Sequence, residues 1–76
     1  MSTTDVISTV AGKVWKLEAA PGKSVGADRP VLILESMKME IPLYSQIEGR
    51  VVEILVEEGD EVAEGQIVAK VSAQQA

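Results

Sequence analysis

A lysine flanked by two methionines is the feature of this sequence that could do chemistry. It lies at the midpoint of the 76-residue chain, in the segment Glu35-Ser36-Met37-Lys38-Met39-Glu40, where the hydrophobic run must reverse direction. At a loop tip in water nothing buries two apolar thioethers, so their presence asks for an explanation beyond packing. Lys38, with its primary amine, is therefore the best candidate for a functional residue.

Several kinds of active site are excluded by composition. The chain has no cysteine and no histidine, so it lacks a thiolate nucleophile, the usual general base and the commonest metal ligand. This excludes a Ser-His-Asp or Cys-His active site. Glu35 and Glu40 could be read as a carboxylate pair for acid–base catalysis, but they flank an exposed tip with no pocket to desolvate them. We do not expect a catalytic role for them.

The ordinary interpretation of a lysine at a turn is a solvated charge, and it suffices for Lys13, Lys16, Lys23 and Lys70. Three observations set Lys38 apart. It lies between two similar halves of the chain, and its neighbours are apolar where polar ones are expected. The turn also lacks the Asn-Gly or Asp-Gly pair of an ordinary two-residue hairpin.

Two interpretations of Met37 and Met39 stay open at this stage. Both side chains could tuck into the ends of a sheet as core, because a strand neighbour of Lys38 points to the opposite face. Alternatively, these unbranched and polarisable side chains would adapt to the surfaces of more than one partner protein.

The net charge and the composition limit which partners and which cellular location the protein can have. The formal net charge of −5 argues against a nucleic-acid partner, because a phosphate backbone needs clustered Lys and Arg. The first residues, Met1 to Asp5, lack the basic and apolar regions of a secretory signal, and no apolar stretch approaches the roughly 20 residues of a membrane span. We expect a soluble, cytoplasmic protein that binds no membrane and is a monomer in isolation.

Six acidic residues with no basic residue among them follow in the second half: Glu53, Glu57, Glu58, Asp60, Glu61 and Glu64. A solvated face is the simplest interpretation. A docking surface for a basic patch on a partner enzyme is the alternative, and calcium binding is disfavoured because the EF-hand spacing is absent.

The two halves of the chain resemble each other. A shift of 37 positions aligns Gly12 with Gly49 and Gly22 with Gly59, and it also aligns many apolar positions. This predicts an internal duplication, with halves of about 8–35 and 45–72 inside a single domain over 1–76 and an ordered core of about 6–72.

The local patterns are those of short strands. Residues 14–18 alternate inward and outward except at Trp15, and 31–34 form an apolar run short enough to be a strand buried on both faces. Ile41 and Leu43 alternate with polar or exposed positions, and Pro42 suggests an edge strand or a strand end. No segment shows a sustained helical period, so we expect almost no helix and an all-β sandwich or flattened barrel.

The motif Glu35-Ser36-Met37-Lys38-Met39 closely resembles the attachment motif of biotinyl domains, the biotin carboxyl carrier type of the biotinyl/lipoyl family. The downstream Gly59-Asp60-Glu61-Val62 and Gly65-Gln66 match the family's pattern as well. The resemblance covers about Ile7 to Val71. It implies the barrel-sandwich hybrid fold, in which two small antiparallel sheets related by a pseudo-twofold axis enclose one core and present the modified lysine on a tight hairpin.

The resemblance also implies a function. A biotin protein ligase would activate biotin as an adenylate, and the neutral amine of Lys38 would attack it to form an amide, with Met37 and Met39 as flanking recognition residues and Glu35, Ser36 and Glu40 as the rest of the hairpin motif. The tethered biotin would move a carboxyl group from a biotin carboxylase to a carboxyltransferase. The chain itself would be a non-catalytic carrier, and its sequence does not name the carboxylase that it serves.

The first half departs from the family pattern. Gly22-Lys23-Ser24-Val25 lacks the aspartate, and Asp28 stands where the offset from Gly65 predicts glycine, so the turn in 26–30 is expected to be of another type. Two alternatives remain for the whole chain: a lipoyl carrier, which usually has Asp-Lys at the tip, and an unmodified β-sandwich interaction module.

Overall fold

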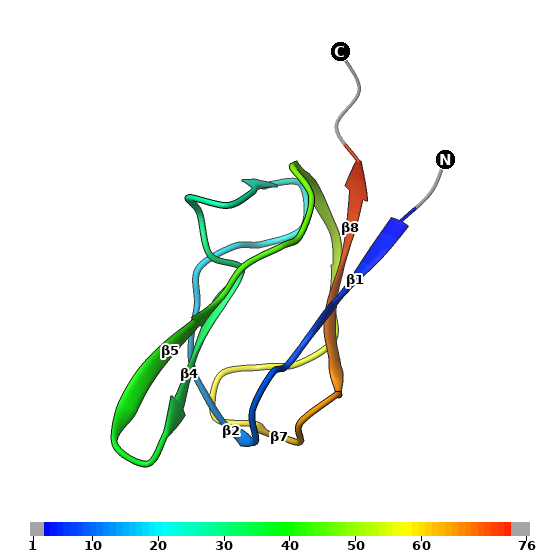
Figure 1. The fold of residues 1–76 in the computed structure, drawn as a ribbon. Helices are drawn as coiled ribbons and strands as arrows, with labels where there is room; N and C mark the ends of the chain where they lie inside the picture. The colour runs from blue at the N-terminus through cyan, green and yellow to red at the C-terminus, as the bar shows by residue number, and fades with distance from the viewer. Residues whose placement is uncertain (1–2, 74–76) are drawn as a thin grey trace.

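The computed structural model describes residues 3–73, which form eight strands and, over that range, no helix (Figure 1). The strands are β1 (Thr3–Ile7), β2 (Gly12–Leu17), β3 (Ser24–Val25), β4 (Leu32–Ser36), β5 (Met39–Leu43), β6 (Gly49–Ile54), β7 (Glu61–Val62) and β8 (Ile67–Ala73). They pair into two antiparallel sheets of four strands each, with the orders β1-β8-β6-β3 and β5-β4-β2-β7. The predicted all-β fold of two small sheets is confirmed.

The duplication is visible in the sheet topology. A shift of 37 residues carries β2 (Gly12–Leu17) onto β6 (Gly49–Ile54) and β3 (Ser24–Val25) onto β7 (Glu61–Val62), and it turns one strand order into the other. Each half lends its two-residue strand to the sheet of the other half, since β3 pairs with β6 and β7 pairs with β2. The two halves are thus interlocked around one core.

A β-bulge occurs at the same place in both halves. The register shifts between Val14 and Lys16 in β2 and between Val51 and Glu53 in β6. A bulge inserts one extra residue, which here is Trp15 or Val52, and both of these side chains are about half exposed. The bulge explains why the alternation fails at Trp15.

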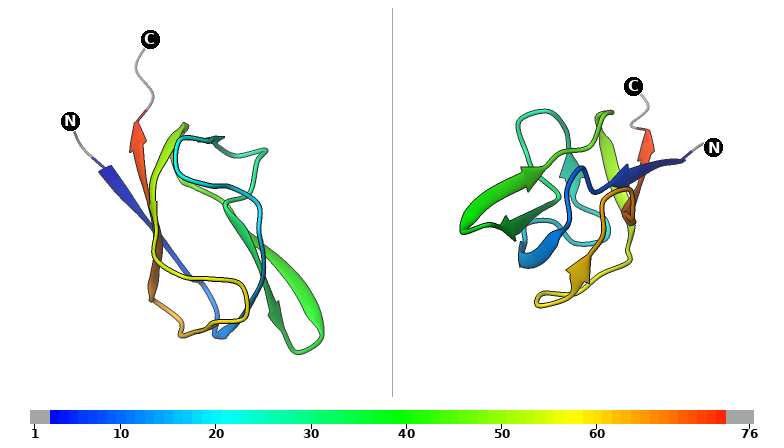
Figure 2. Two further views of the ribbon diagram at one scale, coloured as in Figure 1. Left: turned by 180° about the vertical axis from the view of Figure 1, so that it is seen from behind. Right: turned by 60° about the horizontal axis from the view of Figure 1, so that its bottom comes forward.

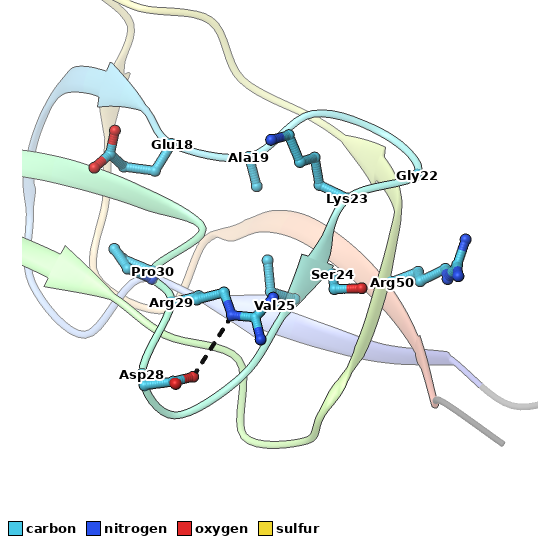
Figure 3. A pocket seen from close by; sticks show the side chains of 10 residues that line it. All are labelled: Glu18, Ala19, Gly22, Lys23, Ser24, Val25, Asp28, Arg29, Pro30 and Arg50. Atoms are coloured by element: carbon cyan, nitrogen blue, oxygen red, sulfur yellow. Dashed lines mark ion pairs between the residues drawn. The ribbon is translucent and has the colours of Figure 1, made fainter. Parts of the chain in front are cut away.

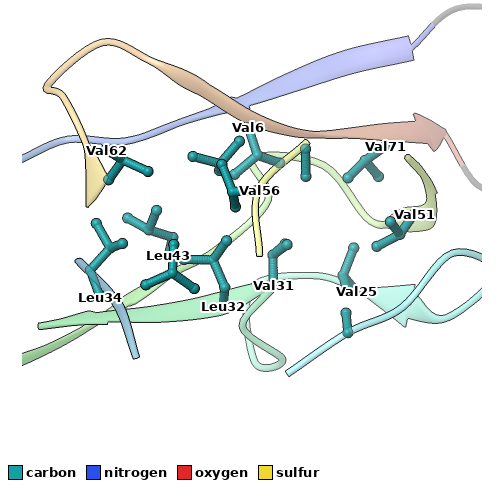
Figure 4. Packing of buried hydrophobic residues seen from close by; sticks show 14 residues of the cluster. Val6, Val25, Val31, Leu32, Leu34, Leu43, Val51, Val56, Val62 and Val71 are labelled. Carbon is teal, nitrogen blue, oxygen red and sulfur yellow. The ribbon is translucent and has the colours of Figure 1, made fainter. Parts of the chain in front are cut away.

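The core lies between the two sheets and consists of valine, leucine and alanine side chains (Figure 4). Val31, Leu32 and Leu34 are completely buried. The prediction that residues 31–34 are buried on both faces is wrong at Ile33, which is only partly buried. Leu32 and Leu34 point into the core, so Ile33 points to the outer face, where it lies opposite Pro42 of the neighbouring strand.

Strand β5 is the edge strand that Pro42 predicted, since it pairs only with β4. Proline is tolerated there because one side of an edge strand makes no ladder hydrogen bonds. Ile41 and Leu43 face inward and their neighbours are exposed, which confirms the predicted alternation.

Strand β1 begins and strand β8 ends at the end of the domain opposite the β4–β5 hairpin (Figures 1 and 2). The duplication predicts this separation, because the 37-residue offset maps Lys38 onto positions 1 and 75, and a pseudo-twofold axis then sets the tip and the two ends of the chain apart. Residues 1–4 and 72–76 are mostly small and polar, which predicts little packing, and this prediction is wrong where it can be judged. Thr3 pairs with Ser72 and Thr4 with Val71, because β1 adds its backbone hydrogen bonds to β8. Residues 1–2 and 74–76 lie outside the described range.

Candidate functional site

Lys38 lies in the two-residue loop of the β4–β5 hairpin. Ser36 pairs with Met39 at the last ladder position, so Met37 and Lys38 alone make the turn. Their φ angles are 52° and 64°, as in the type I′ turns that match the twist of paired strands. Both positions usually hold Asn or Gly, because a β-carbon disfavours this conformation by about 1–2 kcal/mol per residue. The sequence therefore keeps two unfavourable residues at this tip, which points to a use outside the turn itself.

Both methionines are exposed. Met37 is 92% and Met39 is 63% exposed, so the interpretation that they tuck into the core is wrong. Met39 lies on the same face of β5 as Ile41 and the buried Leu43. It is nevertheless exposed because the hairpin extends past the body of the domain (Figure 1). The tip thus presents an amine between two apolar side chains in water, which decides between the two interpretations that the sequence left open.

The surroundings of Lys38 leave its amine accessible. Lys38 is exposed, and the ion pairs within residues 3–73 are Lys16–Glu18 and Arg29–Asp28, which do not involve it. An amide-linked group needs an accessible amine and free space around it, and the hairpin tip offers both. Lys38 therefore fits covalent attachment of a cofactor.

The other residues of the motif form a row beside the tip. Glu35 pairs with Glu40 on one side and with Lys13 on the other, and Lys13 pairs in turn with Glu61. All four side chains are exposed. Carboxylates in this setting are hydrated, so the arrangement supports no acid–base catalysis by Glu35 and Glu40.

Two residues of the acidic stretch accept backbone hydrogen bonds that sequence reasoning missed, one within the same turn and one from strand β2. The carboxylate of Asp60 accepts a hydrogen bond from the Glu57 N–H at 2.9 Å, and that of Glu58 accepts one from the Leu17 N–H at 3.1 Å. The spacing of Asp60 three residues after Glu57 was the available signal, since aspartate commonly closes a turn in this way. All six acidic side chains are exposed, as the solvated-face interpretation requires.

The turn in 26–30 differs from its counterpart, as predicted. In the second half, Gly65 has φ = 86° and Gln66 N donates to Ala63 O at 3.0 Å. In the first half Asp28 takes the place of Gly65 and does not have a positive φ. Gly26 and Arg29 instead form a bridge with hydrogen bonds in both directions.

Metal binding and membrane spanning find no support in the described part of the chain. Residues 3–73 contain no group of three or more Asp or Glu side chains arranged to hold a metal ion. The same residues include no helix with the length and apolar character to span a bilayer.

Comparison with known proteins places the chain among attachment proteins. A family model described as "Biotin-requiring enzyme" matches residues 1–71. The chain is 41% identical over 63 residues to the Biotin/lipoyl attachment protein of Bacillus subtilis, a match that covers 83% of this chain and 86% of that protein. It is 32% identical over 68 residues to the Biotinylated protein TB7.3 homolog of Mycobacterium leprae, with 90% and 96% covered.

Solved structures agree with this fold. The urea carboxylase of Kluyveromyces lactis matches with a TM-score of 0.87 and 35% identity over 95% of this chain, which spans only 6% of that larger protein. The lipoyl domain of the 2-oxoglutarate dehydrogenase complex from Azotobacter vinelandii matches with a TM-score of 0.71 and 26% identity, covering 87% of this chain and 84% of that one. With two interlocked sheets, a duplicated core and an exposed lysine at a hairpin tip, the chain belongs to the biotin/lipoyl attachment family.

Proposed function

We propose that the chain is a biotin carrier and that Lys38 is its attachment residue. The observation that carries the proposal is the tip itself: an exposed lysine in a strained two-residue turn, between two exposed methionines, in a member of this family. In the attachment step, the deprotonated Nζ of Lys38 forms a C–N bond to the carbonyl of an adenylated biotin. AMP leaves with the electrons of the broken C–O bond, and the nitrogen gives up a proton, so the lysine loses its charge.

The hairpin determines how the amine is presented. The turn fixes the backbone of Lys38 with positive φ, and the β4–β5 ladder holds the tip away from the body of the domain. A fixed, protruding tip restricts the region that a tethered group can explore and so raises its effective concentration at a neighbouring active site. When bound, biotin supplies the ureido nitrogen that takes up and releases a carboxyl group.

The proposed partners are a biotin protein ligase, which modifies Lys38, and the biotin carboxylase and carboxyltransferase subunits between which the carboxyl group moves. Relatives support carboxylase partners, because the matched proteins include a pyruvate carboxylase of Staphylococcus aureus, of which this chain spans 5%. In this cycle the chain is a carrier and supplies no catalytic group of its own. The carboxylates beside the tip are exposed, which agrees with a non-catalytic part.

Intact-mass spectrometry with a biotin protein ligase tests the proposal. We expect one biotin on the parent chain and none on Lys38→Arg, because a guanidinium stays protonated and does not form the amide. Lys13→Arg is the matched control, since Lys13 lies opposite Glu35 of the hairpin and its replacement should leave labelling unchanged. Peptide mapping that finds biotin on Lys13, Lys16, Lys23 or Lys70 would contradict the assignment.

A lipoyl carrier is the second candidate, favoured by the match to the Azotobacter lipoyl domain. The residue before Lys38 is methionine, whereas lipoyl domains usually have aspartate there. Incubation with a lipoate ligase under the same conditions separates the two candidates, because the added mass differs. Preferential lipoylation of Lys38 would mean that the chain is a lipoyl carrier and not a biotin carrier.

A further inference from the structure

Both arginines of the chain and one of its lysines line a single pocket. The pocket has a volume of about 510 Å³, and Lys23, Arg29 and Arg50 contribute its basic groups (Figure 3). Ala19, Val25 and Pro30 add an apolar part. These residues come from the segment before β3, from β3 itself, from the turn after it and from strand β6, so only the folded chain brings them together.

The pocket is more positive than the rest of the molecule. Its lining holds three basic and two acidic side chains, Glu18 and Asp28, for a formal charge of 3 − 2 = +1, whereas the whole chain carries −5. Each acidic side chain already has a partner, because Glu18 pairs with Lys16 at 3.5 Å and Asp28 with Arg29 at 3.8 Å. Lys23 and Arg50 take part in neither ion pair, so their charges are available to a ligand.

The duplicated half shows that these cations are not needed to build the turns. Lys23 corresponds to Asp60, whose carboxylate accepts the Glu57 N–H at 2.9 Å. Arg29 corresponds to Gln66, whose Oε1 accepts the Ala63 N–H at 2.9 Å. A side-chain hydrogen bond that closes a turn contributes about 0.5–1.5 kcal/mol. The first half lacks the equivalents of both side-chain hydrogen bonds, because lysine and arginine stand where the second half has aspartate and glutamine.

At both positions a basic side chain has taken the place of one that closes the turn. Lys23 lies over Ala19, and Arg29 extends toward Val25 while its Nε pairs with Asp28 (Figure 3). A basic side chain that gives up a local bond and borders a concave surface is suited to bind an anionic group from outside. The apolar part and the volume suit a peptide segment better than a small oxyanion, which would leave most of the space unfilled.

We propose that this pocket docks an acidic segment of a partner protein. The pocket lies at the same end of the domain as the start of β1 and the end of β8, away from the Lys38 hairpin (Figures 1 and 2). A partner held there leaves the tip free to move between active sites and keeps it at a high local concentration. Docking in this pocket uses side chains that take no part in attachment at Lys38. The docking proposal can therefore be tested separately from the attachment proposal.

Titration of the ¹⁵N-labelled, unmodified chain with hexaglutamate, followed by NMR, tests the proposal. We expect chemical-shift changes confined to residues 22–30 and 50 and their neighbours, and a loss of affinity of about tenfold or more in Lys23→Gln/Arg50→Gln, the loss expected for one to two charge-assisted hydrogen bonds. Lys13→Gln/Lys70→Gln is the matched control, since it removes the same net charge at sites outside the pocket and should bind like the parent.

Three results would overturn the proposal. Equal weakening in both double variants would mean non-specific attraction. Saturable binding of inorganic phosphate with an affinity equal to that of the peptide would mean a small-oxyanion site. Shifts centred on the hairpin would place the contact elsewhere. If the double variant fails to fold, Lys23→Gln alone is compared with Lys13→Gln alone, because Lys23 is exposed and its replacement should leave the fold intact.

Discussion

Gly49 lies against the backbone of Ser72 so closely that a β-carbon on Gly49 would come within 2.0 Å of the Ser72 carbonyl oxygen. The two residues belong to β6 and β8, which pair at the end of the sheet. The pseudo-equivalent Gly12 has a looser contact of 2.8 Å with the Glu35 carbonyl oxygen. Close backbone approach therefore explains the aligned pair Gly12 and Gly49. The other aligned pair, Gly22 and Gly59, has φ angles of 93° and 95° and is explained by turn geometry.

Gly49→Ala should destabilise the domain strongly for this reason. Backbone cannot move aside as a flexible side chain does, so we expect a loss of about 1–3 kcal/mol or more, the usual cost of overpacking. Urea denaturation followed by Trp15 fluorescence gives the value. Gly12→Ala is the graded control and should cost less. A Gly49→Ala variant as stable as the parent would refute the close approach.

Met37→Gly should leave the fold intact or stabilise it. Glycine removes the αL penalty of about 1–2 kcal/mol at φ = 52°, while its greater unfolded-state entropy takes back about 0.5–1 kcal/mol. We therefore expect a net gain of about 0–1.5 kcal/mol in a urea denaturation experiment. Glu40→Gly, in strand β5 where φ is not positive, is the control and should be destabilising. If both variants lose stability equally, the turn at Met37 is not strained.

Met37→Leu/Met39→Leu should separate folding from carriage. Both side chains are exposed, so the double variant should lose less than about 1.5 kcal/mol, the range of volume-conserving swaps. Turnover with the carboxylase partners should fall, because leucine adapts less well than methionine to different surfaces. Leu34→Ala, in the core, is the contrasting variant and should cost about 2–5 kcal/mol. Unchanged turnover would remove the recognition role from the methionines.

Lys23→Asp should stabilise the first-half turn. An aspartate there is placed to accept the Ala20 N–H, as Asp60 accepts the Glu57 N–H in the second half, and the gain should be about 0.5–1.5 kcal/mol. Asp60→Ala, the reciprocal variant, should lose a similar amount. Thermal melts at matched ionic strength measure both. If Lys23→Asp lowers the melting temperature, Lys23 supports the turn and the argument from duplication fails.

Much of the fold and the position of Lys38 at a hairpin tip could be predicted because most of the signals are local. The period-two alternation around Ile41 and Leu43 identified an edge strand, and Pro42 agreed with it. The glycine pairs disclosed the duplication, and Lys38 between two methionines marked the hairpin tip. The alternation and the tip depend on residues near one another in the chain, where the side-chain type and the backbone conformation are directly coupled. The duplication is a match between two such local patterns 37 residues apart.

Tertiary structure alone decided the rest, because strand pairing between distant residues leaves no local pattern. Thr3 pairs with Ser72, and this ordered a segment that seemed to have nothing to pack against. The inward direction of Leu32 and Leu34 turned Ile33 outward, although all three are equally apolar in sequence. Exposure of both methionines followed from the length of the hairpin beyond the barrel, and the pocket of Lys23, Arg29 and Arg50 exists only because β3 crosses to pair with β6.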